Sequence, residues 1–211
     1  MYGKMNKGYL EYAPSDLKTD NGILLNFNTN EELMKEYGYK EIIDILPEYN
    51  EGYQYLFRGE PTENDNNITI NYEIREKNIE ELKEKKILES KVLLEEYLEE
   101  HPLLSKARHE EGRYYNITSQ KQQYLNSTVA IAYLNMSTNP ENPDPVSWND
   151  TGEECEPWTC NQIFQLAKEV YEYVGSLASK QRKMEKEITD LESAKEVYEY
   201  SISYEAEAIQ E

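Results

Sequence analysis

The chain of 211 residues has few of the residue types on which several protein classes depend. It contains two cysteines, two histidines, two tryptophans and three phenylalanines. Two cysteines cannot form a disulfide framework, and a zinc site needs about four ligands, whereas Cys155 and Cys160 have no histidine near them. The sequence therefore predicts no bound metal and no disulfide in a reducing compartment.

Long apolar runs are also missing. No stretch approaches the roughly 20 residues that span a bilayer, and the first ten residues lack the apolar centre of a signal peptide. We therefore expect no membrane insertion, synthesis in the cytoplasm and no export by a cleaved signal.

Positive charge is scarce, with 22 basic against 42 acidic residues and a net charge of −20. Nucleic acids and anionic membrane surfaces both need a basic patch, so neither is an expected partner. The acidic surface favours solubility and mutual repulsion between molecules.

Recognisable catalytic patterns are missing too. The nine glycines are scattered and form no phosphate-binding loop. His101 precedes Pro102, and His109 lies in a charged segment, so neither falls within a catalytic arrangement. The many carboxylate pairs single out no acid–base couple. The sequence predicts a protein that is not an enzyme and needs no cofactor.

Tyrosine is abundant instead, with 19 copies, while only 38% of residues are hydrophobic. Such a composition suits thin cores and wet interfaces. It indicates an elongated fold, or one in which helices complete their cores by association.

The pattern along the chain predicts an α+β fold in four segments. These are a small α+β docking module over residues 1–75, a connecting helix over 76–100, a helix and a tryptophan-containing hairpin over 101–160, and a long helical, coiled-coil-like segment over 161–211.

Turn and cap residues add detail to the first segment. A short hairpin is predicted over Lys4–Tyr12, and Thr29 with Glu32 forms a capping box for a helix that Gly38 ends. The polar stretch Gly59–Asn67 is predicted as a hairpin loop. Three further strands are expected near residues 42–45, 53–57 and 68–74.

In the third segment, Trp148 and Trp158 flank a turn at Gly152 and predict a short hairpin with paired tryptophans. We interpret these three residues as structural anchors, with the tryptophans packed under the long helix. The alternative is that their rings stack on sugars.

The fourth segment repeats apolar residues at intervals of three and four, which is typical of a coiled coil. The polar stretch Ser179–Lys183 separates two runs of different phase and predicts a stutter or a turn. Self-association is favoured over an antiparallel helix pair within one chain. The predicted oligomer seam consists of Ile163, Leu166, Val170, Tyr173, Leu177, Met184, Ile188, Leu191, Tyr198 and Ile202.

Two sets of residues carry a resemblance to phage proteins. The first set is Met1–Lys4, Tyr12–Pro14, Glu31–Leu33, Gly38–Lys40, Pro47, Gly52–Tyr53 and Ile70–Ile74. It resembles the N-terminal module of small tail-associated proteins of Gram-positive contractile phages and defective prophages.

The second set is Gly112–Tyr115 with Thr118, Trp148–Glu153, Cys155, Trp158–Thr159, Tyr173–Val174, Gln181 and Glu187–Ile188. It is similar to an uncharacterised domain of phage tail-fibre and tail-fibre-associated proteins. The long linker before Trp148, rich in proline and asparagine, departs from that pattern.

The resemblance implies a structural, non-enzymatic protein of a phage or a phage-tail-like bacteriocin, made in the bacterial cytoplasm and located in the virion tail or tail-like particle. It implies tail fibre or baseplate proteins as partners, and a homotrimer is expected because tail fibres are commonly trimeric. The alternatives are a tail-fibre assembly chaperone absent from the mature particle and a carbohydrate-binding module.

Overall fold

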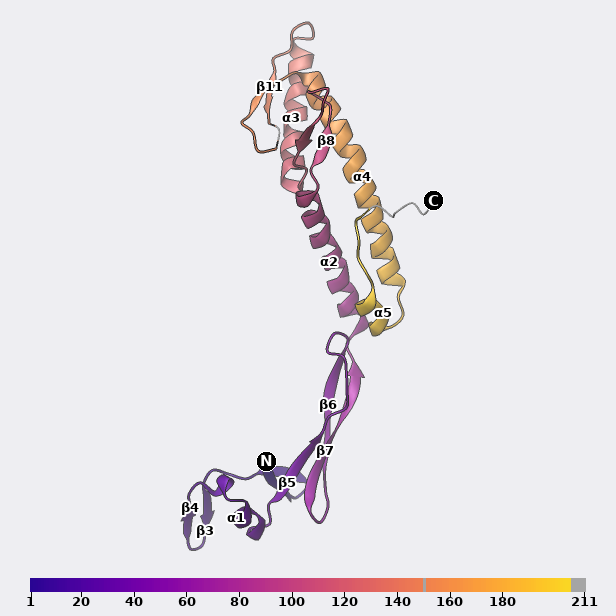
Figure 1. Ribbon diagram of the computed structural model, residues 1–211. Helices are drawn as coiled ribbons and strands as arrows, with labels where there is room; N and C mark the ends of the chain where they lie inside the picture. Colours follow the sequence, from indigo (N-terminus) through magenta and orange to yellow (C-terminus); the bar gives the residue numbers. More distant parts are fainter. Residues whose placement is uncertain (150, 206–211) are drawn as a thin grey trace. The chain divides into compact units, whose positions relative to one another are not determined.

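The computed structural model describes residues 1–149 and 151–205 and contains both helices and strands. The predicted mixed α+β fold is therefore confirmed. The chain divides into two compact units, Met1–Asn78 and Ile79–Glu211 (Figure 1). The first unit corresponds to the predicted docking module, and the three later segments lie together in the second unit.

A five-stranded sheet with the order β2-β1-β5-β7-β6 forms the centre of the first unit. Its strands are β1 (Tyr2–Asn6), β2 (Tyr9–Tyr12), β5 (Lys40–Ile45), β6 (Gln54–Glu63) and β7 (Asn67–Glu76). The hairpin predicted near residues 4–12 is present as β1 and β2. Lys7 and Gly8 both have positive φ angles, 50° and 88°, as a two-residue turn that follows the strand twist requires.

The inner face of this sheet has a small core. Ile42, Ile68 and Ile70 are buried, and β5 pairs with β7 in parallel with Ile42 opposite Ile68. A parallel pair needs a crossover, which here includes β6. The side chains of Met5, Leu10 and Tyr72 pack against the three isoleucines.

The loop predicted over residues 59–67 is mostly strand, which corrects the prediction. β6 continues to Glu63, with an irregularity in register between Arg58 and Pro61. An edge strand with a bulge tolerates glycine and proline, so these residues did not end it. Only a tight turn remains, in which Asn64 Oδ1 accepts hydrogen bonds from the N–H groups of Asn66 and Asn67.

A second small core of the first unit surrounds Phe27, Met34 and Tyr39. It is formed with β3 (Leu17–Thr19), β4 (Gly22–Leu24), η1 (Phe27–Thr29) and α1 (Glu31–Glu36). The predicted cap of α1 is wrong by one residue. Asn30 Oδ1 accepts from the Leu33 N–H at 3.1 Å, while the Thr29 hydroxyl donates to the carbonyl of Asn26.

The second unit is mainly helical. Its helices are α2 (Ile79–Glu100), α3 (Ser119–Thr138), α4 (Cys160–Asp190) and α5 (Ala194–Glu199). Two short hairpins join them, β8 (Leu103–Ser105) with β9 (Arg113–Tyr115) and β10 (Val146–Trp148) with β11 (Glu156–Trp158).

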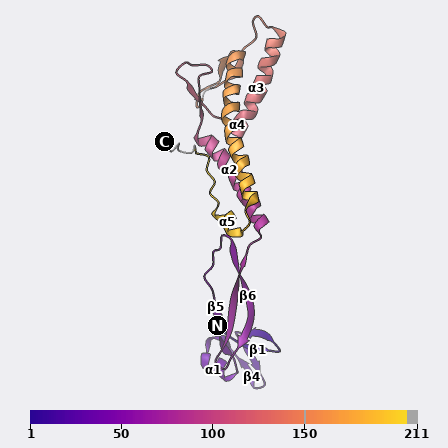
Figure 2. The same cartoon turned by 90° about the vertical axis from the view of Figure 1, so that its right-hand side faces the viewer.

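Both α2 and α3 pack along α4 (Figure 2). The helix α2 runs antiparallel to α4, since Lys83 Nζ donates to the carbonyl of Thr189 at 2.9 Å and Lys91 Nζ lies 3.9 Å from Glu185 Oε1. Lys83 thereby places a positive charge at the carbonyl end of α4, where the helix dipole favours it.

The long helix predicted over 161–211 ends at Asp190, which corrects its length, and residues 206–211 of that segment lie outside the described residues. The backbone of Leu191 is extended, and Ser193 forms a capping box with Glu196 that begins α5. The hydrogen bond with the Ser193 side chain, and then those from the backbone N–H groups of Glu192 and Ser193, lower the pKa of Glu196. The predicted break at 179–183 lies inside α4, because the lysines, glutamine and arginine there favour helix.

Candidate interaction surfaces

The stripe of α4 that the sequence assigned to an oligomer seam faces the inside of the second unit. Six of its members are buried in a single chain: Ile163, Leu166, Val170, Leu177, Met184 and Ile188. Tyr173, Leu191 and Ile202 are half-buried, and Tyr198 is exposed on α5. The seam assignment is corrected for the buried members, because they are already covered within a single chain.

The two tryptophans lie on one face of the β10–β11 hairpin. Trp148 pairs with Glu156 and Trp158 with Val146, so the tryptophans are diagonal neighbours and not direct partners. Gly152, with a φ of 84°, lies in the connecting turn. The exposed fractions are 8% for Trp148 and 0% for Trp158, so neither ring offers a face on which a sugar could stack.

Aromatic and charged contacts hold this hairpin in the core. The Trp158 ring meets Tyr115 edge-on, with centroids 5.5 Å apart and planes at 84°. The Arg108 guanidinium lies 5.2 Å from the Trp158 ring and pairs with Glu156 at 2.5 Å. Contacts of both kinds stabilise buried aromatic residues and orient them.

An open groove of about 950 Å³ lies between α2, the second half of α4 and the chain after α5. Tyr97, Tyr173 and Tyr204 line it together with Lys180 and Lys183. Burial is the main cause that raises the pKa values of Tyr173 and Tyr204. The groove is thus lined by three tyrosine rings together with lysine and glutamate side chains.

The described residues contain no cluster of three or more histidine, cysteine or acidic side chains arranged to hold a metal. Cys155 is an exposed free thiol and Cys160 a buried one. His101 stacks on the Tyr97 ring with centroids 4.0 Å apart. No helix within residues 1–149 and 151–205 combines the length and apolarity needed to cross a membrane.

The outer face of the first unit's sheet exposes apolar side chains that sequence reasoning treated only as strand residues. Ile43 and Ile45 of β5 alternate with buried Ile42, and Tyr55 and Phe57 of β6 lie on the same side. We call these four residues the outer sheet face. Their exposed fractions lie between 38% and 51%.

Polar side chains of β7 run through the middle of this face. The Arg75 guanidinium lies 3.3 Å from the Phe57 ring centroid and pairs with Glu73 at 3.2 Å. Thr69 and Asn71 lie opposite Ile43 and Ile45 in the register. Since β7 lies between β5 and β6, its outward polar residues separate the two isoleucines from the two aromatic rings, and the face presents two apolar pairs on either side of a polar row.

The chain matches no family model, no curated protein and no solved structure. The resemblance to phage tail proteins therefore stays a prediction that rests on the two sets of residues that carry it.

Proposed function

We propose that the protein is a structural component of a phage or phage-tail-like particle. In this role it connects to, or forms part of, the tail fibre or receptor-binding apparatus at the baseplate. The first unit is its docking module, and the helices of the second unit pack in a coiled-coil-like manner. The virion tail or tail-like particle is its site of action.

The observation that carries a docking role is the outer sheet face. Four large apolar side chains remain open on one small unit whose inner core consists of three buried isoleucines. Exposed apolar side chains that gather on one face of a small unit, here as two pairs on either side of β7, favour an interaction site there. A partner that covers the outer sheet face gives the thin sheet a second apolar layer. This added burial favours a partner that stays bound. That this partner belongs to a phage tail is inferred from the sequence resemblance.

The test is quantitative mass spectrometry of purified tail particles from the producing bacterium. Copies of this chain are counted against the sheath protein. We expect a fixed copy number for the unaltered protein. We also expect that Ile45→Glu, which places a charge on the outer sheet face, removes it from the particle.

Ile23→Glu is the matched control, because Ile23 is an equally accessible isoleucine of β4 that lies outside the outer sheet face. It should stay in the particle. Circular dichroism of both purified variants shows whether they fold. Presence in the cell with absence from the particle would replace this proposal by the assembly-chaperone alternative.

A further inference from the structure

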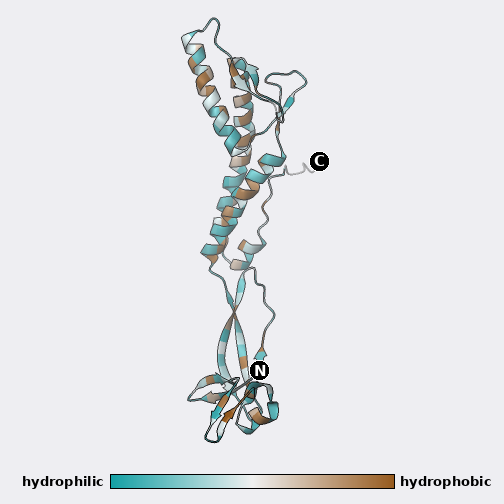
Figure 3. Ribbon diagram, turned by 90° about the vertical axis from the view of Figure 1, so that its left-hand side faces the viewer, coloured by the Kyte–Doolittle hydropathy of each residue, from teal (hydrophilic) through white to brown (hydrophobic). Residues whose placement is uncertain are grey.

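The helix α3 differs from the other helices of the second unit in charge. One of its 20 residues, Lys121, is charged, whereas α2 has 12 charged residues among 22. Figure 3, which is coloured by hydropathy, shows brown and pale turns along α3 among teal ones that come from its amide side chains. In a chain of net charge −20, so long an uncharged helix surface needs an explanation.

One side of α3 is used within the chain. Leu125 and Ala132 are buried, and Val129 and Met136 pack against the same core. The opposite side contains a stripe at alternating intervals of three and four residues, the spacing of a coiled-coil seam. We call it the α3 stripe, and it consists of Tyr124, Ser127, Ile131, Leu134 and Thr138.

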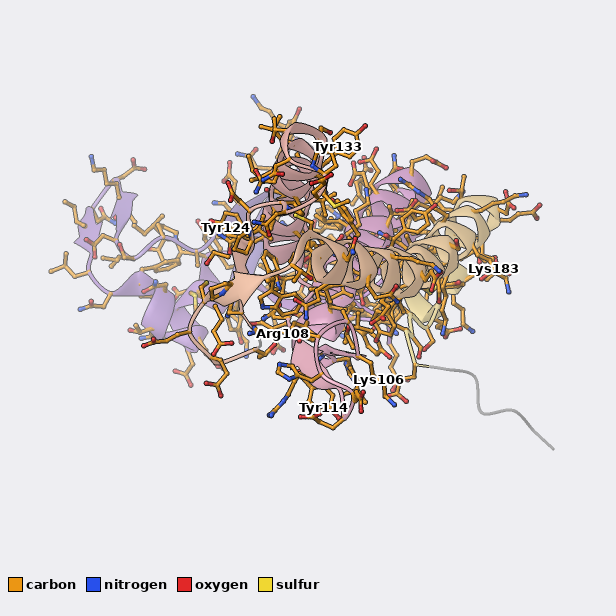
Figure 4. All side chains as sticks on the ribbon, turned by 90° about the horizontal axis from the view of Figure 1, so that it is seen from above. Lys106, Arg108, Tyr114, Tyr124, Tyr133 and Lys183 are labelled. Carbon is orange, nitrogen blue, oxygen red and sulfur yellow. The ribbon has the colours of Figure 1, made fainter. Side chains whose placement is uncertain are left out.

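The apolar members of the α3 stripe are open to solvent. The exposed fractions are 56% for Tyr124, 53% for Ile131 and 54% for Leu134. Figure 4 shows Tyr124, the first member of the stripe, projecting from α3 in a different direction from Tyr133. The surface therefore has no partner within the part of the chain that the structure describes.

The serine and threonine hydroxyl groups of the stripe already donate hydrogen bonds within α3. The Ser127 hydroxyl donates to the carbonyl of Gln123 at 3.1 Å, and the Thr138 hydroxyl donates to the carbonyl of Leu134 at 3.0 Å. Because their donors are already satisfied, covering these hydroxyls leaves no unpaired O–H group.

We infer that the α3 stripe is a self-association surface, whose occupant is the α3 stripe of a second copy of this chain. Two copies that met through α2 would bring rows of carboxylates together, whereas two α3 stripes meet without like charges. A helix with the same spacing and the same uncharged side chains is also what fits such a seam. This inference places the expected homo-oligomer on α3 in place of α4, and it does not rest on the tail role.

The experiment is sedimentation velocity of the full chain from micromolar to submillimolar concentration. The unaltered protein should form a homo-oligomer, and added salt should strengthen it by screening the net negative charge. Leu134→Glu should weaken association by about tenfold or more, because it introduces repelling charges into the seam.

Leu88→Glu is the matched control, since Leu88 is a leucine of α2 that is 62% exposed outside the α3 stripe. It should leave the oligomer intact. Ile131→Ser, which adds no charge, is a second variant that must also weaken association, and circular dichroism checks the fold of each.

A chain that stays monomeric at the highest concentration in high salt overturns the inference. An oligomer that resists both α3 variants, or that Leu88→Glu disrupts equally, overturns it as well. The copy number in tail particles tests the proposed function separately, so the failure of one leaves the other standing.

Discussion

The hydroxyl of Tyr204 donates a hydrogen bond of 2.7 Å to the backbone carbonyl of Ser90, 114 residues earlier in the sequence. Both residues are buried, and the bond joins the extended chain after α5 to the middle of α2. Buried hydroxyl groups need such partners. The last described segment is therefore an integral part of the second unit.

Tyr204→Phe should reduce the free energy of unfolding of the second unit by about 1 kcal/mol, because it removes this buried hydrogen bond and keeps the ring. Urea unfolding followed by tryptophan fluorescence measures the change, since both tryptophans lie in this unit. Tyr114→Phe, which removes an exposed hydroxyl from β9, should have little effect. Equal losses in the two variants would show that the Tyr204 bond contributes nothing specific.

Tyr200 should make stability depend on alkaline pH. Burial, then the 2.6 Å hydrogen bond to Glu187 and its negative charge, raise the pKa of Tyr200 from 10.0 to about 12. The unfolded chain therefore releases this proton first. The contribution is fully present below about pH 10 and is lost as pH rises toward 12.

The expected loss is about 1–2 kcal/mol, after a reduction for solvent screening at this partly exposed site. Tyr200→Phe should show a shallower decline between pH 10 and 12 than the unaltered protein does. Tyr171→Phe, at an exposed position of α4, is the control. Parallel stability–pH curves for the unaltered protein and Tyr200→Phe would contradict the prediction.

Trp158→Ala should destabilise the second unit by about 3–5 kcal/mol, because it empties a fully buried site that Tyr115 and Arg108 surround. The fluorescence of the remaining Trp148 follows unfolding in denaturant. Tyr114→Ala on the neighbouring hairpin removes a large exposed ring and should cost less than about 1 kcal/mol. A small loss for Trp158→Ala would mean that the ring is not a core residue.

Two glycines should respond to alanine in opposite directions. A Cβ at Gly59 would lie 2.7 Å from the carbonyl oxygen of Asn71 on the paired strand, so Gly59→Ala should cost about 1–3 kcal/mol. A Cβ at Gly175 in α4 meets nothing within 4 Å, so Gly175→Ala should stabilise by about 0.5–1 kcal/mol. Thermal unfolding by circular dichroism measures both. A change of the same sign at the two positions would refute the argument.

Local sequence patterns predicted the elements that are set by residues close together in the chain. The helix over 76–100 begins at Ile79, and its end at Glu100, before Pro102, follows from the proline. The capping box Ser193–Glu196 was equally local and visible in the sequence, but the heptad-like spacing through that region concealed the break. The tryptophan hairpin was found because a turn glycine separates two short extended runs.

Pairings between distant parts of the chain could not be read in the same way. The parallel pairing of β5 with β7 and the pairing of β8 with β9 depend on contacts that no local pattern encodes. The spacing of apolar residues in α4 identified a stripe that is buried. It did not identify what covers the stripe, since a helix of the same chain and a helix of another chain can both do so. The near absence of charge in residues 119–138 was visible in the sequence, but no expectation about the surface of α3 was drawn from it.

The contact between Ser90 and Tyr204 also sets an order of events during synthesis. The first unit closes with residues up to Asn78, so it has all its parts while the rest is still being translated. The hydrogen bond from Tyr204 to Ser90 cannot form before Tyr204 has been synthesised, which takes about 6–25 s more at about 5–20 residues per second. Throughout that interval the N-terminal unit is tethered to a nascent chain that cannot yet make this last contact of the second unit.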